Sequence, residues 1–99
     1  MTPYRYTFDP AVPADELGDT LVLAVIAAEA LHGESQTRLD AGHAVGDGGR
    51  VVVIDAGTAV GRDLNRLFVG FATREFGPDS FRVERAEPAP AARPEPAAA

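Results

Sequence analysis

Hydrophobic side chains recur along this chain at two alternating spacings, and the order of these spacings constrains the fold more than any other feature. A spacing of two is typical of a strand with one buried face, whereas spacings of three and four are typical of a helix with one apolar side. Read from the N-terminus, the order is strand, helix, strand, strand, helix, strand. The corresponding ranges are 4–8, 15–32, 36–45, 50–55, 58–76 and 81–84.

Residues that favour helix ends and turns mark the boundaries of these segments. Asp15 and Thr58 can cap the N-termini of the two predicted helices, and Gly33 and Gly77 can end them. The segment 46–49, with the sequence Gly-Asp-Gly-Gly, accepts positive φ angles and therefore predicts a hairpin turn between the two middle strands.

This order of elements predicts an α+β fold, a ferredoxin-like βαββαβ sandwich of two layers. Two helices would cover one face of a four-stranded antiparallel sheet, with the first and third strands in the centre. The side chains expected to face the helices are Tyr4, Tyr6, Phe8, Leu39, Phe81 and Val83. Those expected on the open face are Arg5, Thr7, Arg38, Asp40, Arg82 and Glu84. The alternative is a three-stranded sheet whose first or last strand pairs elsewhere, for instance with a second chain.

Length and composition favour one domain over residues 1–85. The segment 86–99 contains only Ala, Pro, Glu and Arg, so it has no side chains with which to build a core, and we expect a disordered tail. The longest apolar run, 21–28, is far shorter than the roughly twenty residues of a membrane span. The first residues lack the basic and apolar regions of a secretory signal, so we expect a cytoplasmic protein.

Charge and residue content exclude several classes of function. The chain has 15 acidic and nine basic residues, a formal net charge of -6, which disfavours nucleic acid and anionic membranes as partners. It has no cysteine, and His32 and His43 lack the spacing of a metal motif. Ser35 and Ser80 lack the surroundings of a nucleophile. We therefore predict no catalytic residue, no metal site and no cofactor.

One turn is a candidate for binding a small anion. Gly57 and Thr58 follow Asp55 where a strand leads into a helix, and free N–H groups at a helix N-terminus can bind anions. The competing interpretation is that Thr58 caps the helix and Asp55 shapes the turn.

The first predicted helix is apolar on nearly all sides. The side chains on the arc expected to face the sheet are Leu17, Leu21, Ala24, Val25, Ala28 and Leu31. Val22, Leu23, Ile26 and Ala30 lie on the opposite arc, which a two-layer domain of this size leaves in water.

We therefore predict a small non-catalytic protein–protein interaction or assembly module, whose partner is a second copy or another chain. The competing explanations for the outer arc are scattered surface hydrophobes, or a terminal segment folded over them. The alternative function is a ligand-binding or enzymatic ferredoxin-like domain that uses the turn at Gly57 and Thr58.

Overall fold

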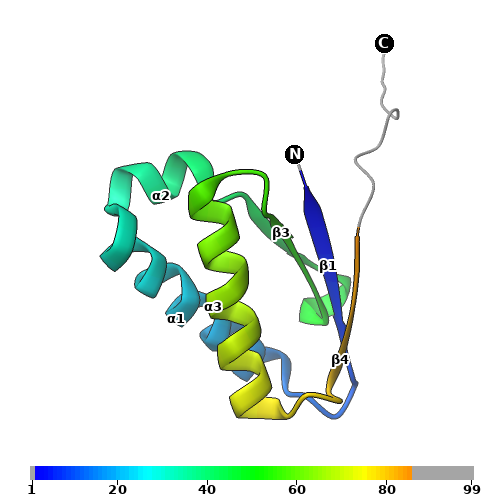
Figure 1. Ribbon diagram of the computed structural model, residues 1–99. Helices are drawn as coiled ribbons and strands as arrows, with labels where there is room; N and C mark the ends of the chain where they lie inside the picture. Colours follow the sequence, from blue (N-terminus) through cyan, green and yellow to red (C-terminus); the bar gives the residue numbers. More distant parts are fainter. Residues whose placement is uncertain (1, 86–99) are drawn as a thin grey trace.

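The computed structural model describes residues 2–85 and shows a single sheet with the helices on one of its sides (Figure 1). None of the helices in this range is long and apolar enough to cross a bilayer. The predicted tail, 86–99, lies outside the described residues.

In chain order the elements are β1 (Pro3–Phe8), α1 (Ala14–His32), α2 (Glu34–Asp40), β2 (His43–Gly46), the 3-10 turn η1 (Asp47–Gly49), β3 (Val51–Asp55), α3 (Ala59–Phe76) and β4 (Phe81–Arg85).

The sheet has the strand order β2-β3-β1-β4, and all its neighbouring strands are antiparallel. The central pair, β1 and β3, aligns Tyr6 with Val52, and the pair of β1 with β4 aligns Tyr6 with Val83. The two central strands are therefore the first and the third, as the sequence predicts. Together with the order of the elements, this confirms the ferredoxin-like topology and excludes the three-stranded alternative.

The prediction of a strand over residues 36–45 is wrong for most of that range. Residues Glu34–Asp40 form the short helix α2, and strand β2 covers only His43–Gly46. Leu39, expected to face the helices from the sheet, lies on α2 and is 79% exposed. Arg38 and Asp40 are likewise on α2 and not on the open sheet face.

Local hydrogen bonds explain why this segment is helical. Gly33 adopts a φ of 87°, which ends α1 and lets the chain turn into α2 at once. The Gly33 carbonyl accepts hydrogen bonds from the Thr37 backbone N–H at 3.1 Å and from the Thr37 hydroxyl at 2.8 Å. Arg38 pairs with Glu34 one turn earlier at 3.0 Å.

The predicted cap of the first helix is also wrong, whereas that of the last helix is confirmed. Helix α1 begins at Ala14, and Pro13 is the N-cap residue, with a φ of -66°. Asp15 lies inside the first turn, where a carboxylate interacts favourably with the helix dipole. Thr58 caps α3, which ends at Gly77 as expected.

Aromatic side chains of β1 form the centre of the core. Tyr6 is 2% and Phe8 3% exposed, and both lie edge-on to the buried Phe68 of α3, at ring-centroid distances of 5.6 and 5.9 Å. The ring of Phe81 on β4 is tilted by 33° relative to that of Phe8, and the two ring centroids are 5.0 Å apart. Tyr4 and Phe81 are partly buried against this core, as expected. Val83 shares their face but is 54% exposed, because β4 is an edge strand.

Gly61, in the first turn of α3, lies very close to the backbone at the end of β3. A Cβ atom at this position would lie 2.0 Å from the backbone oxygen of Asp55 at the end of β3. Real Cβ atoms do not come this close, so only glycine fits without displacing α3 from β3. By contrast, a Cβ atom at Gly70, later in the same helix, would meet no atom within 4 Å.

We predict that Gly61→Ala destabilises the protein, whereas Gly70→Ala stabilises it. The first substitution forces the helix away from the strand and should cost roughly 1–3 kcal/mol or more. The second removes the entropic cost of glycine in a helix and should add about 0.5–1 kcal/mol. Urea unfolding of both variants measures the two changes. Equal effects would contradict the close approach at Gly61.

Candidate functional site

The outer face of α1 is the surface on which the sequence places an interaction site. In the structure Val22, Leu23 and Ile26 are 56%, 58% and 53% exposed, and Ala30 is exposed as well. The opposite side of the helix packs into the core, where the buried residues are Leu17, Thr20, Leu21, Ala24 and Ala28. We call Val22, Leu23, Ile26 and Ala30 the outer face of α1.

The exposure of this face follows from the architecture. Helix α1 packs beside α3 in the helical layer, and no second layer covers its other side in the described part of the chain (Figure 1). Val25, which we expected to face the sheet, is only partly buried against the core. Leu31, expected to face the sheet, is 64% exposed, because it lies in the last turn of α1, next to the bend at Gly33.

The turn from β3 into α3 has the hydrogen bonds of a structural turn. One Asp55 carboxylate oxygen accepts hydrogen bonds from the backbone N–H groups of Thr2 and Gly57, both at 2.9 Å. The hydrogen bond from Thr2 is the largest cause that lowers the pKa of Asp55 below its ordinary value of 3.8, and the bond from Gly57 acts in the same direction. The N–H of Gly57, which the anion hypothesis needs, therefore already has a carboxylate partner.

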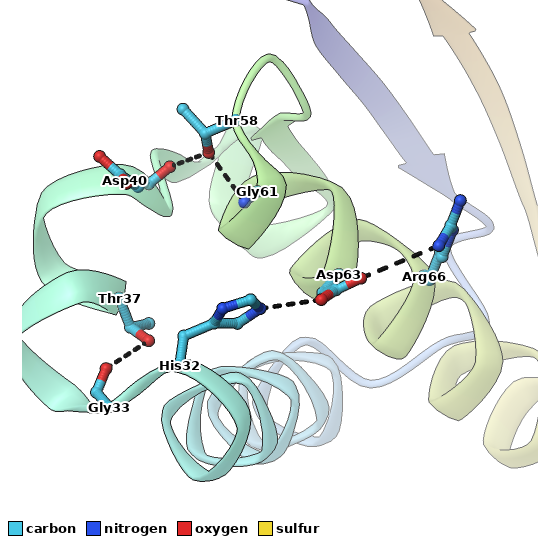
Figure 2. Close-up of polar contacts among 8 residues, drawn as sticks. All are labelled: His32, Gly33, Thr37, Asp40, Thr58, Gly61, Asp63 and Arg66. Carbon is cyan, nitrogen blue, oxygen red and sulfur yellow. Dashed lines mark hydrogen bonds and ion pairs between the residues drawn. The ribbon is translucent and has the colours of Figure 1, made fainter.

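Thr58 links three segments through its hydroxyl group (Figure 2). The hydroxyl oxygen accepts a hydrogen bond from the Gly61 N–H at 2.9 Å, which is the capping contact. The same hydroxyl donates to the backbone carbonyl of Asp40, at the end of α2, at 2.7 Å. Gly57 and Thr58 thus have structural partners, and their binding of an anion stays a prediction.

His32 also has a structural partner, which no sequence pattern indicates. Its Nε2 atom lies 2.8 Å from Oδ2 of Asp63 on α3, and Arg66 lies 3.8 Å from the other oxygen of Asp63 (Figure 2). The contact ties the last turn of α1 to α3. Asp63 is 31 residues from His32 in sequence, so no local spacing signals this pair.

The remaining polar candidates lie apart from one another. His43 makes a hydrogen bond through Nδ1 to the Ala41 carbonyl at 2.9 Å, and the Ser80 hydroxyl donates to the Gly77 carbonyl at 2.6 Å. Within residues 2–85, no group of three or more His, Cys, Asp or Glu side chains could hold a metal ion. These residues form no reactive cluster.

One buried tyrosine has a perturbed acidity. The Tyr6 hydroxyl donates to Oδ1 of Asn65 on α3, and burial raises the pKa of Tyr6 to about 12. Its neutral form is therefore favoured at physiological pH, and it serves as a buried hydrogen-bond donor between β1 and α3.

The open face of the sheet carries a broad depression of about 560 Å³. Val51 and Val53 of β3 form its half-buried middle, and Arg5 and Glu84 lie opposite each other on β1 and β4. Aromatic side chains are absent from its lining, so it lacks the stacking platform of an RNA-binding sheet.

Comparisons with known proteins give no relative from which a function could be transferred. No protein-family model, no curated protein and no solved structure matches the chain.

We predict that Thr58→Ala lowers the free energy of unfolding by about 1–2 kcal/mol, because it removes the cap of α3 and the contact with Asp40. Thr58→Ser retains the hydroxyl group and should stay within about 0.5 kcal/mol of wild type. Urea unfolding measures the stability of both variants.

A separate experiment tests anion binding at this turn. If phosphate raised the melting temperature of the wild type and only Thr58→Ala abolished that gain, the prediction of anion binding would be supported.

We predict that Asp55 contributes to stability in a pH-dependent way. Because its pKa is lower in the folded state, its contribution is fully present above the ordinary carboxyl pKa of 3.8 and is lost as the pH falls through the lowered value. Asp55→Asn should therefore destabilise the protein at about pH 6 and flatten the loss of stability toward about pH 2. Unfolding curves at both pH values test this, and parallel losses in the two proteins would contradict it.

Proposed function

We propose that this protein is a small non-catalytic interaction module that binds another polypeptide through the outer face of α1. One observation carries the proposal: Val22, Leu23 and Ile26 are each more than half exposed on a single arc of the helix. Side chains three and four residues apart lie next to one another on a helix, so these form a continuous apolar stripe.

Burial of the stripe in a complex would contribute favourable free energy. Complete burial of an aliphatic side chain contributes roughly 1.5–3 kcal/mol, and because each of these three side chains is more than half exposed, over half of that free energy could still be gained at each position. Together they could contribute roughly 2.5–5 kcal/mol, which offsets only part of the cost of association. The proposal therefore needs further contacts around the stripe, and a partner whose surface complements them.

The polar groups offer less support for an enzymatic function. His32, Asp55 and Thr58 each contact a partner that stabilises a helix end or a turn. We therefore assign no reaction to them. The cytoplasmic location expected from the sequence, and binding to either a second copy or a different chain, belong to this proposal.

The test uses an uncharged helical peptide of leucine, alanine and glutamine with leucine along one face. Titrated into the isotopically labelled protein, it should shift the backbone amide NMR signals of Val22, Leu23 and Ile26. A Val22→Gln, Ile26→Gln variant should lose these shifts, because glutamine favours a helix but removes the apolar area.

Val83→Gln is the matched control, because Val83 is 54% exposed but lies on β4. This variant should bind like wild type. The proposal fails if no amide of α1 responds to the peptide and sedimentation gives a monomer at every protein concentration.

A further inference from the structure

The net charge of the protein is concentrated around α1. Residues 6–37 contain six carboxylates and no arginine. The charge of this segment, -6, therefore equals the formal net charge of the whole chain. The rest of the chain has nine acidic residues and nine arginines, and is therefore neutral. The six carboxylates are Asp9, Asp15, Glu16, Asp19, Glu29 and Glu34. Four of them lie on α1 itself, whereas Asp9 precedes it and Glu34, on α2, is paired with Arg38.

Several of these carboxylates border the outer face of α1. Asp19 and Asp15 lie on the same arc as Val22 and Ile26, about one and two turns closer to the N-terminus than Val22, respectively. Glu29 lies three residues after Ile26, beside the stripe at its other end. The apolar stripe therefore has negative charge at both ends.

The stability of the helix does not account for all of this charge. Asp15 and Glu16 are in the first turn, where the helix dipole favours them. Glu29 is in the last turn, where the dipole disfavours a carboxylate, and Asp19 is beyond the first turn. Among the ion pairs within residues 2–85, none involves Asp19 or Glu29.

We infer that the outer face of α1 binds a basic amphipathic helix, in which apolar side chains are flanked by lysine or arginine. This inference rests on the proposed function and names the partner for that surface. The stripe from Val22 to Ala30 spans about 12 Å along the helix axis, which is two turns of a partner helix. Apolar side chains of the partner cover the stripe, and its cations lie against Asp19 and Glu29.

A second copy of the chain fits this surface poorly. It would bring the same carboxylates toward each other, because α1 itself contains no arginine. Like charges in contact disfavour a complex, and an anionic membrane would be repelled for the same reason. The negative border therefore selects a positively charged partner and speeds its encounter with the apolar stripe.

The experiment compares three peptides with one leucine face, whose flanking positions are glutamine, lysine or glutamate. The lysine peptide should bind about tenfold more tightly than the glutamine peptide, as expected for several exposed charge pairs, and the glutamate peptide more weakly. Fluorescence anisotropy measures the affinities, and amide NMR shifts show whether α1 is the site. The advantage of lysine should disappear in about 1 M salt.

Charge-neutralised variants separate the local border from the overall charge. Asp19→Asn, Glu29→Gln should abolish most of the lysine advantage. The control Glu75→Gln, Asp79→Asn removes two exposed carboxylates elsewhere and should retain it. Three outcomes would each overturn the inference while the proposed function stands. They are equal binding of the three peptides at α1, an equal loss of the lysine advantage in both variants, and a wild-type dimer formed through α1. If no peptide reaches α1 and the protein stays monomeric, both fail.

Discussion

The packing of the two central aromatic residues of β1 against α3 and β4 is the interaction on which the rest of the structure depends. Tyr6 and Phe8 are almost completely buried, and Phe68 of α3 contacts both of their rings. This contact joins the sheet to the helical layer, and Gly61 lets the start of α3 approach the end of β3. Because the sheet and α3 already fill one side of α1, the other side of that helix has nothing left in the described chain to pack against.

Most of the fold is predictable from the sequence. Strand β1 alternates aromatic and polar residues, and helix α3 has apolar residues three and four positions apart. Local patterns correctly predict strands β1 and β3, helix α3 and the glycines that end the helices. The sequence does not distinguish α2 from a strand, because Thr37 and Ala41 each lie two residues from Leu39 and four residues from each other. That spacing suits a strand as well as one turn of helix. The deciding contact, from Thr37 to the Gly33 carbonyl, depends on the bend at Gly33.

The same distinction applies to the candidate site: local sequence patterns predict some of its features, whereas others depend on contacts between distant segments. The exposure of Val22, Leu23 and Ile26 follows from helical geometry and the number of layers, so the sequence suffices to predict it. The pairing of His32 with Asp63 and the contact from Thr58 to Asp40 join segments whose approach depends on the complete tertiary structure. The need for glycine at position 61 is hidden for the same reason, since a glycine early in a helix has no sequence signal of its own.

The position of β1 in the middle of the sheet affects how the chain folds during synthesis. Tyr4 pairs with Arg85, so β1, which is synthesised before the other strands of this sheet, obtains its second neighbour only after nearly all of the described chain has been made. Pairings so distant in sequence form slowly. Until then the growing polypeptide exposes an unpaired edge of β1, a place where nascent chains on neighbouring ribosomes can join by mistake.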